Sequence, residues 1–369
     1  MERPIFKPIG TPALELDTPA LTVDVDKLDK NISTMAAFFE TKSAKLRPHI
    51  SGHGSPAIAH KQLASGGTVD GIATTTVGQA EVFARYGFND IFISNVVATA
   101  VKMKRVCALA KVAEITVAVD NASAIDALSE AATTAGTSVN VVIYLRTRQN
   151  SIGVGQGSVA TDLATMIENA NGVNFKGLIA YEGTLLDVAN GDIASESRKW
   201  VDLVLDTRQT IENAGIDVQV VSIGGTHNYE IVSEIDGVTE VQAGSYALMD
   251  EKYKTTRPQF LNAGRVMTCV TSMPEPGTVL TDGGRKAIGA DSGVPGIDGM
   301  PEATMRGLSA EHGSIAFDPA FHHGLELGDR IWCIPRDIAG SINVHDYLFA
   351  IRKGNLEAIW DLPSRGQYR

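Results

Sequence analysis

The sequence has few cysteines, and they are far apart. Cys107, Cys269 and Cys333 are the three cysteines among 369 residues. An odd, widely spaced set excludes the disulfide framework of small secreted domains and shows no paired metal-binding spacing. The pattern favours a reducing compartment.

Long apolar runs and clusters of basic residues are also missing. No stretch approaches the ~18 apolar residues of a membrane-spanning helix, and the run Met1–Phe6 lacks the apolar core of a signal peptide. The net charge is −11, without a basic cluster, which argues against nucleic acid or an anionic membrane as the main partner. We expect a soluble, cytoplasmic protein that binds anions only in a local positive pocket.

Hydrophobic residues make up 44% of the chain, enough for one large domain and a smaller one. Near-continuous apolar runs, typical of parallel strands buried on both faces, alternate with amphipathic helical patterns. The expected strands are 69–74, 90–94, 114–119, 138–146, 175–181, 218–223 and 238–243. The expected helices are 56–66, 77–87, 98–111, 121–135, 158–170, 192–214 and 228–235. With a strand around Arg47, eight β segments joined by helices predict a (β/α)8 TIM-type barrel of the α/β class.

A different pattern precedes and follows this barrel. A strand at 20–25, with a helix after it from Asp26, is surplus to closure and is expected to join the smaller domain. After about residue 255 the helical periodicity ends, and strands are expected at 265–271, 278–282 and 330–334, with a hairpin over 347–360 turned at Gly354-Asn355. The predicted divisions are therefore 1–25, a barrel at 26–254 and a C-terminal β domain at 255–369, in which 283–327 form functional loops.

One stretch, Lys45 to Gly54, concentrates polar side chains. If it is extended, Arg47, His49 and Ser51 point one way, and His53 follows. Buried polar groups need partners, so the alternatives are hydrogen-bonded structural fixtures in a barrel mouth or functional groups.

The same stretch resembles a known family. The run Arg47-Pro48-His49, followed by Ser55-Pro56-Ala57-Ile58-Ala59, is similar to the first barrel strand of the D-threonine aldolase and D-serine dehydratase group. These are fold-type III pyridoxal-phosphate enzymes related to alanine racemase. The resemblance extends from Thr18 to Trp360, and it implies a barrel followed by a β domain and a homodimer whose site the partner's β domain closes.

The family's Schiff-base lysine is not in its usual place. In the family the arginine-proline-histidine run is followed by that lysine and often by a second one three residues later, where this chain has Ser51 and Gly54. A hydroxyl cannot form an imine. Covalent pyridoxal phosphate is therefore disfavoured, while a non-covalently held pyridoxal phosphate or a divalent metal stays open.

Two glycine-containing turns follow expected strands. Gly224-Gly225-Thr226-His227 enters a helix, so its amides can cradle an anion, and Gly244-Ser245 forms a second small-residue cup. The resemblance implies that both turns hold the cofactor phosphate and makes His227 a candidate substrate contact. The alternative is tight turns that simply need glycine.

Other polar residues end the expected strands. Alternation places Tyr144, Arg146 and Arg148 on one face, and two arginines at this spacing suit a carboxylate or phosphate; the alternative is a solvated edge. Tyr181, in the family's tyrosine-glutamate-glycine element, is a candidate proton donor or an amphipathic cap on its strand.

The family's metal pair, a histidine and an aspartate or cysteine two residues later, falls on Asp337 and Ala339. One oxygen ligand survives, so the usual site is incomplete and Asp337 is a weak metal candidate. His312, in a matching Glu-His-Gly element, is a candidate substrate contact. His312 or His49 with Asp337 would make a rearranged metal site, and a histidine hydrogen-bonded to a carboxylate is the alternative.

These residues predict an enzyme of lyase type acting on a small anionic hydroxy acid or β-hydroxy amino acid. Arg47, Arg146 and Arg148 would bind the anion, and His49, Ser51, His53 and Tyr181 would move protons. Two alternatives stay open: a conventional pyridoxal-phosphate and metal-dependent aldolase or dehydratase in which another lysine such as Lys45 reaches the cofactor, and a catalytically silent ligand-binding homologue.

Overall fold

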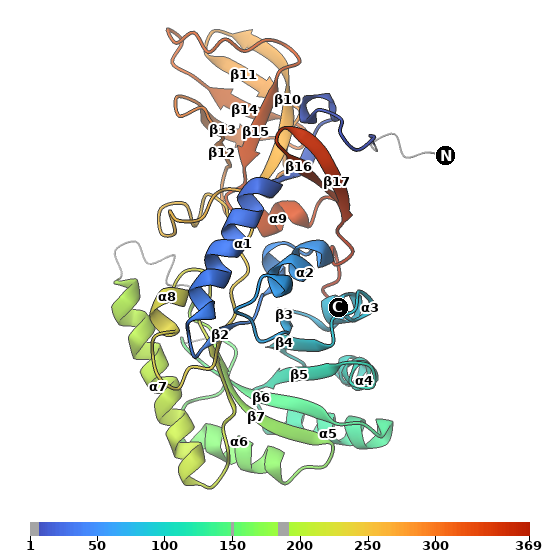
Figure 1. The fold of residues 1–369 in the computed structure, drawn as a ribbon, viewed down its shortest axis with the longest axis vertical. Coiled ribbons are helices and arrows are strands. Elements are labelled where there is room, and N and C mark those ends of the chain that lie inside the picture. The colour runs from blue at the N-terminus through green and yellow to red at the C-terminus, as the bar shows by residue number, and fades with distance from the viewer. Residues whose placement is uncertain (1–6, 149–150, 184–191) are drawn as a thin grey trace. The chain divides into compact units, whose positions relative to one another are not determined.

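The computed structural model describes residues 7–148, 151–183 and 192–369 (Figure 1). The run Met1–Phe6, on which the signal-peptide expectation rested, lies outside them. Contacts divide the chain into two compact units. The barrel unit comprises Met35–Ser51, Ala59–Gly244 and Gln367–Arg369, and the β unit comprises Met1–Thr34, Gly52–Ile58 and Ser245–Gly366.

The barrel unit contains an eight-stranded parallel sheet in the order β2-β9-β8-β7-β6-β5-β4-β3. Its strands are β2 (Lys45–Leu46), β3 (Ile72–Thr74), β4 (Asp90–Val96), β5 (Glu114–Val119), β6 (Val139–Leu145), β7 (Val173–Ala180), β8 (Val220–Ile223) and β9 (Glu240–Val241). Parallel bridges from Leu46 to Thr68 and from His49 to Ala73 join the two ends of this order. The predicted (β/α)8 architecture is confirmed.

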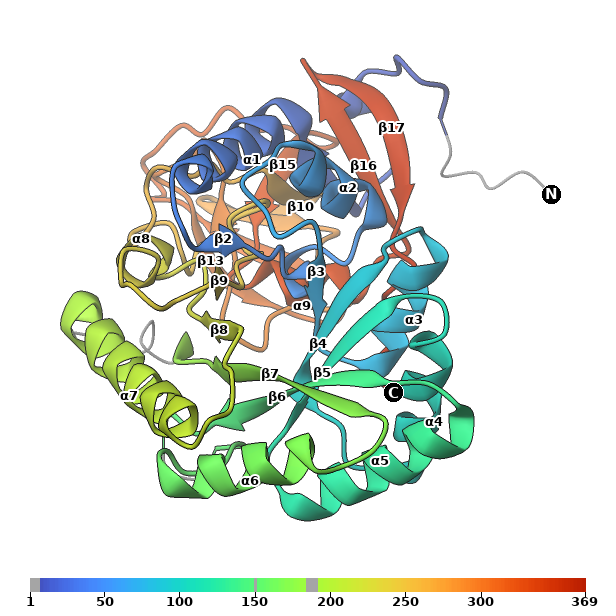
Figure 2. The same cartoon turned by 60° about the horizontal axis from the view of Figure 1, so that its bottom comes forward.

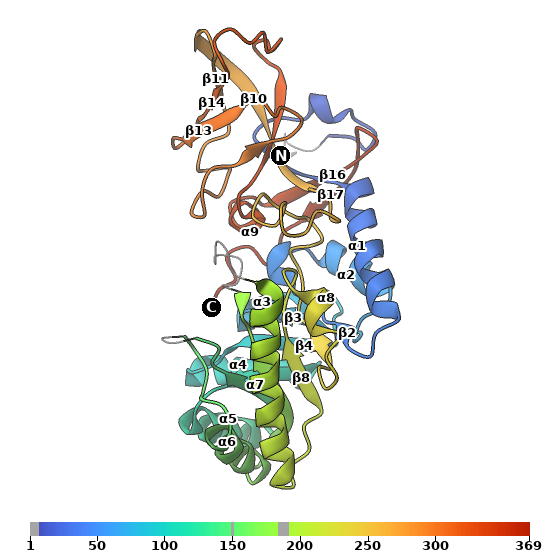
Figure 3. The same ribbon diagram turned by 90° about the vertical axis from the view of Figure 1, so that its left-hand side faces the viewer.

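Helices connect these strands, as the apolar periodicity predicted. They are α2 (Pro56–Ala64), α3 (Val77–Arg85), α4 (Ala100–Leu109), α5 (Ala122–Ala135), α6 (Ser158–Glu168), α7 (Ile193–Asn213) and α8 (Tyr229–Val232). Figure 2 shows α3 to α6 outside the strands that they connect, and Figure 3 shows α7 beside α8. Side-chain caps fix several starts: Thr76 forms a capping box with Gln79 on α3, and Asn121 caps α5.

The barrel interior is packed with side chains, so it is a core and not a pore. One buried cluster draws residues from several strands: Ala73, Phe92, Ala118, Val142, Tyr144 and Ile179. Because these side chains fill the interior, we look for catalytic polar groups at the carboxyl ends of the strands.

The β unit is built on a second sheet in the order β13-β14-β11-β10-β1-β16-β17, with β15 pairing with both β10 and β12. The strands are β1 (Ala20–Asp24), β10 (Gly264–Glu275), β11 (Thr278–Thr281), β12 (Gly296–Ile297), β13 (Thr304–Leu308), β14 (Gly313–Ala316), β15 (Arg330–Ile334), β16 (Tyr347–Arg352) and β17 (Asn355–Asp361). Strand β1 pairs antiparallel with β10 and parallel with β16. The 3-10 helix η1 (Ala13–Glu15) precedes it, and helix α1 (Val25–Glu40) follows it.

Three expectations about this unit are wrong in detail. The stretch 283–327 contains β12, β13 and β14 rather than loops alone, because these strands are too short for a visible alternation. A helix, α9 (Ile338–Ile342), interrupts the all-β pattern where Asp337 caps it. The final hairpin turns at Lys353-Gly354, where both residues have positive φ, and Asn355 already pairs with Arg352.

Candidate functional site

The carboxyl end of β2 holds a chain of four polar groups. His49 Nδ1 lies 2.8 Å from Ser51 Oγ, and His49 Nε2 lies 3.1 Å from Ser94 Oγ. Ser94 in turn donates to the carbonyl oxygen of Thr74 at 3.1 Å. The chain thus joins the ends of three neighbouring strands, β2, β3 and β4.

The direction of these bonds fixes the tautomer of His49. Ser94 has one hydroxyl hydrogen, and it donates this hydrogen to the Thr74 carbonyl, so it accepts from His49 Nε2–H. Burial lowers the pKa of His49 to about 4, so the ring is neutral at physiological pH and its Nδ1 carries a lone pair. The hydroxyl of Ser51 therefore donates to an unprotonated ring nitrogen.

The backbone holds His49 from both sides. Its N–H donates to the carbonyl of Ala243 at 3.1 Å, and the N–H of Ala73 donates to the Pro48 carbonyl at 2.8 Å. A Cβ on Gly244 would lie 1.9 Å from the His49 carbonyl oxygen, so only glycine fits there. The extended backbone predicted for 45–51 continues to His49, but a 3-10 turn, η2 (Ile50–Gly52), then removes Ser51 from the alternation.

The end of β6 brings positive charge to the same end of the barrel. Strand β6 stops at Leu145, so Arg146 and Arg148 lie in the loop after it and are exposed. Tyr144 is buried in the interior cluster. Burial raises the pKa of Tyr144 to about 12, the Glu182 charge raises it as well, and the Arg148 charge opposes them. Arg148 and Glu182 are therefore close enough to act on this hydroxyl, which stays protonated.

A buried polar hub follows β7 and β8. Asn228 donates from Nδ2 to Glu182 and, at 3.0 Å, to Ser197 Oγ. Glu182 Oε1 also lies 3.6 Å from His227 Nε2, and both side chains are almost fully buried. The ring of Tyr181 packs edge-on against His227 with centroids 6.1 Å apart. His227 therefore lies beneath Tyr181, which is half exposed.

The first predicted anion-binding turn, Gly224 to His227, spends one backbone N–H on a hydrogen bond within the turn. The N–H of Gly225 donates to Asn228 Oδ1 at 3.0 Å, so this amide is engaged within the turn. Gly224 has φ +92° and packs against Val232, where a Cβ would lie 2.6 Å from Cγ2. Thr226 is buried. Tight packing requires glycine at 224 and 244, and the anion contacts predicted for these turns stay predictions.

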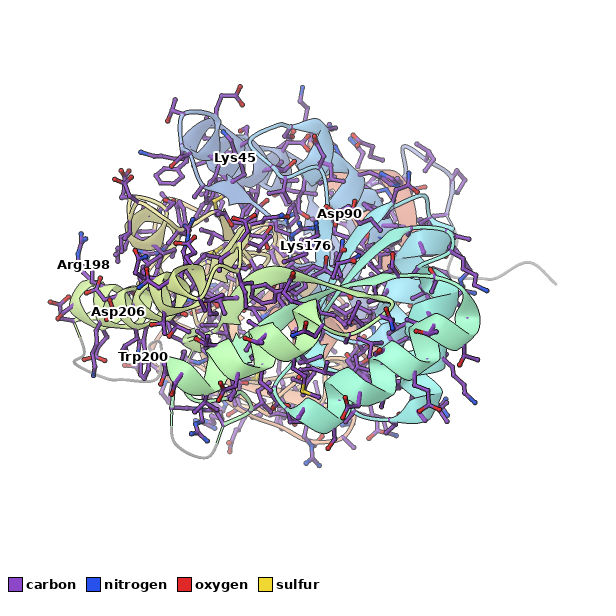
Figure 4. All side chains as sticks on the ribbon, turned by 90° about the horizontal axis from the view of Figure 1, so that it is seen from below. Lys45, Asp90, Lys176, Arg198, Trp200 and Asp206 are labelled. Atoms are coloured by element: carbon purple, nitrogen blue, oxygen red, sulfur yellow. The ribbon has the colours of Figure 1, made fainter. Side chains whose placement is uncertain are left out.

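Arg47 is paired inside the barrel. Its Nε donates to Glu240 Oε2 and its Nη1 donates to Asp90 Oδ1, both at 2.9 Å. Asp90 and Glu240 are the first residues of β4 and β9, and Figure 4 labels Asp90 together with Lys45. The amino ends of barrel strands serve stability, so these contacts give Arg47 a structural role and lend no support to the predicted substrate contact.

The remaining candidates belong to the β unit. Ser245 and His53 are there, and His53 Nδ1 accepts the N–H of Ser55 at 3.1 Å. His312 is exposed in the turn between β13 and β14. Asp337 caps α9 by accepting the N–H of Ala339 at 3.0 Å.

No group of three or more His, Cys, Asp or Glu side chains able to hold a metal ion occurs within residues 7–148, 151–183 and 192–369. At the two positions of the predicted metal pair, Asp337 offers side-chain oxygen and Ala339 offers no donor, so these residues do not fit the family's metal. Across the same residues, no helix has the length and apolar character needed to cross a membrane.

Comparison with known proteins identifies the family. The alanine racemase N-terminal domain matches residues 23–252, and a putative serine dehydratase domain matches 263–351. A D-threonine aldolase from Arthrobacter is 33% identical over 97% of this chain and 95% of the relative. A 3-hydroxy-D-aspartate aldolase from Paracoccus denitrificans is 29% identical over 97% and 94%. The crystal structure of D-threonine aldolase from Filomicrobium marinum superposes with a TM-score of 0.93 at 31% identity, covering 98% and 99% of the two chains.

The chain belongs to the D-threonine aldolase and D-serine dehydratase family. The aldolases named above are lyases, and the predicted resemblance is confirmed.

The family implies pyridoxal phosphate bound to a lysine, and the barrel does not fit that attachment. Its seven strand-to-helix loops contain no lysine: 47–55, 75–76, 97–99, 120–121, 146–157, 181–192 and 224–228. The segment after the eighth strand, β9, belongs to the β unit from Ser245 on and contains Lys252 and Lys254. Two lysines lie in the strands. Lys45 Nζ donates to the carbonyls of Phe39 and Glu40 at the end of α1, and Lys176 donates to Gln219 at 3.1 Å. Neither ammonium points to the His49 end of β2, so Lys45 is not a substitute for the missing lysine.

Sequence reasoning missed two residues of this site. Ser94 lies in β4 directly after the apolar run Ile91-Phe92-Ile93, and a polar side chain at that point of a buried strand was the available signal. Asn228 was noted only as part of a turn. The available signal was its position directly before a short helix and three residues after the Gly-Gly pair. From there the Asn228 side chain can accept a hydrogen bond from the turn.

Proposed function

We propose that this protein is a lyase that cleaves a small anionic β-hydroxy acid or β-hydroxy amino acid by retro-aldol reaction or elimination, without an imine to a barrel lysine. Family membership supports the reaction class. The single observation that carries the mechanism is the neutral His49 with its lone pair directed at Ser51.

Proton transfer is assigned to this pair. In the retro-aldol direction, the substrate's β-hydroxyl gives its proton to Ser51 Oγ while Ser51 passes its own proton to His49 Nδ1. The bond between the α and β carbons then breaks, the β carbon leaves as an aldehyde, and the electron pair stays on the carbon next to the carboxylate. Return of a proton to that carbon is assigned to the hydroxyls of Tyr144 and Tyr181, which lie at the ends of the neighbouring strands β6 and β7.

Anion binding is assigned to Arg146 and Arg148. A planar guanidinium pairs with a carboxylate in two parallel bonds and keeps its charge at any physiological pH. Positive charge beside the substrate carboxylate also stabilises the electron pair left by cleavage, because that pair delocalises onto the carboxylate. The influence of Arg148 on the pKa of Tyr144 supports this placement.

Product analysis tests the proposal. Purified protein is incubated with D-threonine and with D-3-hydroxyaspartate, and the products are identified: acetaldehyde or glyoxylate from cleavage, and ammonia with a 2-oxo acid from elimination. We expect one of these products from the parent and a loss of at least ~100-fold in rate in His49→Asn, the scale of a general base. His60→Asn is the matched control, because His60 bonds to the Tyr86 carbonyl and stacks on Phe88.

Two results would contradict the proposal. Formation of no product from either substrate would favour a silent ligand-binding homologue. Activity that requires added pyridoxal phosphate and survives His49→Asn would favour the conventional enzyme.

We also propose a homodimer, on the family pattern alone. Light scattering should give twice the mass of the 369-residue chain, and an active monomer at high concentration would refute it.

A further inference from the structure

Ser51 is bonded differently from two other serines of the barrel unit. Ser94 donates to the Thr74 carbonyl, and Ser151 donates to the Arg148 carbonyl at 2.9 Å. Both hydroxyls are therefore held by weakly basic amide oxygens. Ser51 Oγ instead faces an imidazole nitrogen at 2.8 Å and belongs to an exposed residue.

The lone pair on that nitrogen is held in place from the opposite side of the ring. Since Ser94 accepts from Nε2–H, the tautomer with hydrogen on Nδ1 loses this bond and is disfavoured. The Ser51 N–H also points at Nδ1, at 3.3 Å. A serine hydroxyl, a histidine base and a third group that orients the base make the general arrangement of an activated nucleophile.

We propose that Ser51 is a nucleophile, with His49 as its general base and Ser94 as the positioning residue, and that it takes acyl groups from small activated esters. This activity goes beyond the lyase reaction and does not depend on it.

The acyl transfer is balanced within these residues and water. Ser51 Oγ forms a bond to the carbonyl carbon while its proton moves to His49 Nδ1. The bond from the carbonyl carbon to the ester oxygen breaks, and the leaving alcohol takes the proton from His49. Water then repeats the sequence, releasing the acid and restoring Ser51. No oxidant, reductant or further reactant is needed.

Covalent labelling of the full-length protein tests the proposal. A fluorophosphonate reacts with an activated serine by forming a bond from Oγ to phosphorus and expelling fluoride, and peptide mass spectrometry locates the label. We expect stoichiometric label on Ser51, none on Ser51→Ala, and a burst of p-nitrophenol from p-nitrophenyl acetate in the parent. Ser151→Ala should match the parent in both measurements.

Four further variants separate chemistry from structure. His49→Asn should label at least ~100-fold more slowly, the contribution of a general base. Ser94→Ala should label about tenfold more slowly, the effect of losing one orienting bond, and Ser94→Thr, which keeps the hydroxyl, should recover. Ser51→Cys should be alkylated by iodoacetamide faster than the native cysteines, which covers the case in which Ser51→Ala does not fold.

The labelling pattern decides the outcome. Absence of label on the parent, label on a serine other than Ser51, or equal labelling of Ser94→Ala and Ser94→Thr would each overturn the assignment.

Discussion

Replacing Arg47 with methionine should destabilise the barrel strongly and leave substrate binding intact. The guanidinium and the Glu240 carboxylate have side-chain exposures of 9% and 3%, so solvent screens this pair little. Glu240 Oε1 has no hydrogen-bond partner among the described residues, so the buried negative charge of Glu240 depends on its ion pair with Arg47. Burial lowers the pKa of Arg47, but the charges of Glu240 and Asp90 outweigh that effect and raise it.

The expected cost follows from that geometry. Removing one partner of a buried ion pair leaves the other charge uncompensated and costs ~3–5 kcal/mol, whereas replacing both partners with uncharged groups is often nearly neutral. The Asp90 contact adds little, because its side chain is 29% exposed. Arg47→Met should therefore cost about 3–5 kcal/mol, and Arg47→Met with Glu240→Leu should cost clearly less.

Urea unfolding followed by circular dichroism measures both variants against the parent. Arg105→Ala is the matched control, because Arg105 makes a bidentate pair with Glu81 on a side chain that is 31% exposed, where the expected loss is under ~1 kcal/mol. A loss for Arg47→Met no larger than the control would refute the buried-charge reasoning. A tenfold rise in KM with unchanged stability would show that Arg47 contacts the substrate.

Three other perturbations have defined outcomes. Gly244→Ala should lower activity more than tenfold and cost ~1–3 kcal/mol, because its Cβ would lie 1.9 Å from the His49 carbonyl; Gly155→Ala, with open space around it, should do neither. Burial raises the pKa of Asp250 to about 7 from 3.8, so the folded state holds the Asp250 proton more tightly than the unfolded state. The free energy of unfolding should therefore fall as pH rises between these two values. Asp250→Asn should remove this pH dependence when unfolding is measured in urea titrations. Arg148→Ala should weaken binding of an anionic ligand by ~1.5–3 kcal/mol in calorimetry, and unchanged affinity would make Arg148 a surface residue.

The barrel could be predicted because its signals are local. Buried parallel strands appear as apolar runs wherever they occur, and the run at 114–119 coincides with β5. The short strands β13 and β14 were missed because β13 contains Gly307 at an irregularity and neither shows alternation over enough residues.

The site was harder, because its partners are distant in sequence. Alternation correctly places Arg47 and His49 on one face, but it does not tell at which height along the barrel axis a side chain finds its partner. Arg47 meets carboxylates 43 and 193 residues away, and His49 meets a serine 45 residues away. Only the closed barrel brings these residues together, so the roles of Arg47 and Ser94 could not be inferred from either strand alone.

In the proposed mechanism, Ser51 and His49 perform the chemistry at the strand end where the family has its Schiff-base lysine. The most direct test is to incubate the protein with pyridoxal phosphate, reduce it with borohydride and measure its intact mass. We predict no stoichiometric pyridoxyl adduct, because the barrel's seven strand-to-helix loops contain no lysine. One pyridoxyl group per chain, mapped to a single lysine, would contradict this mechanism.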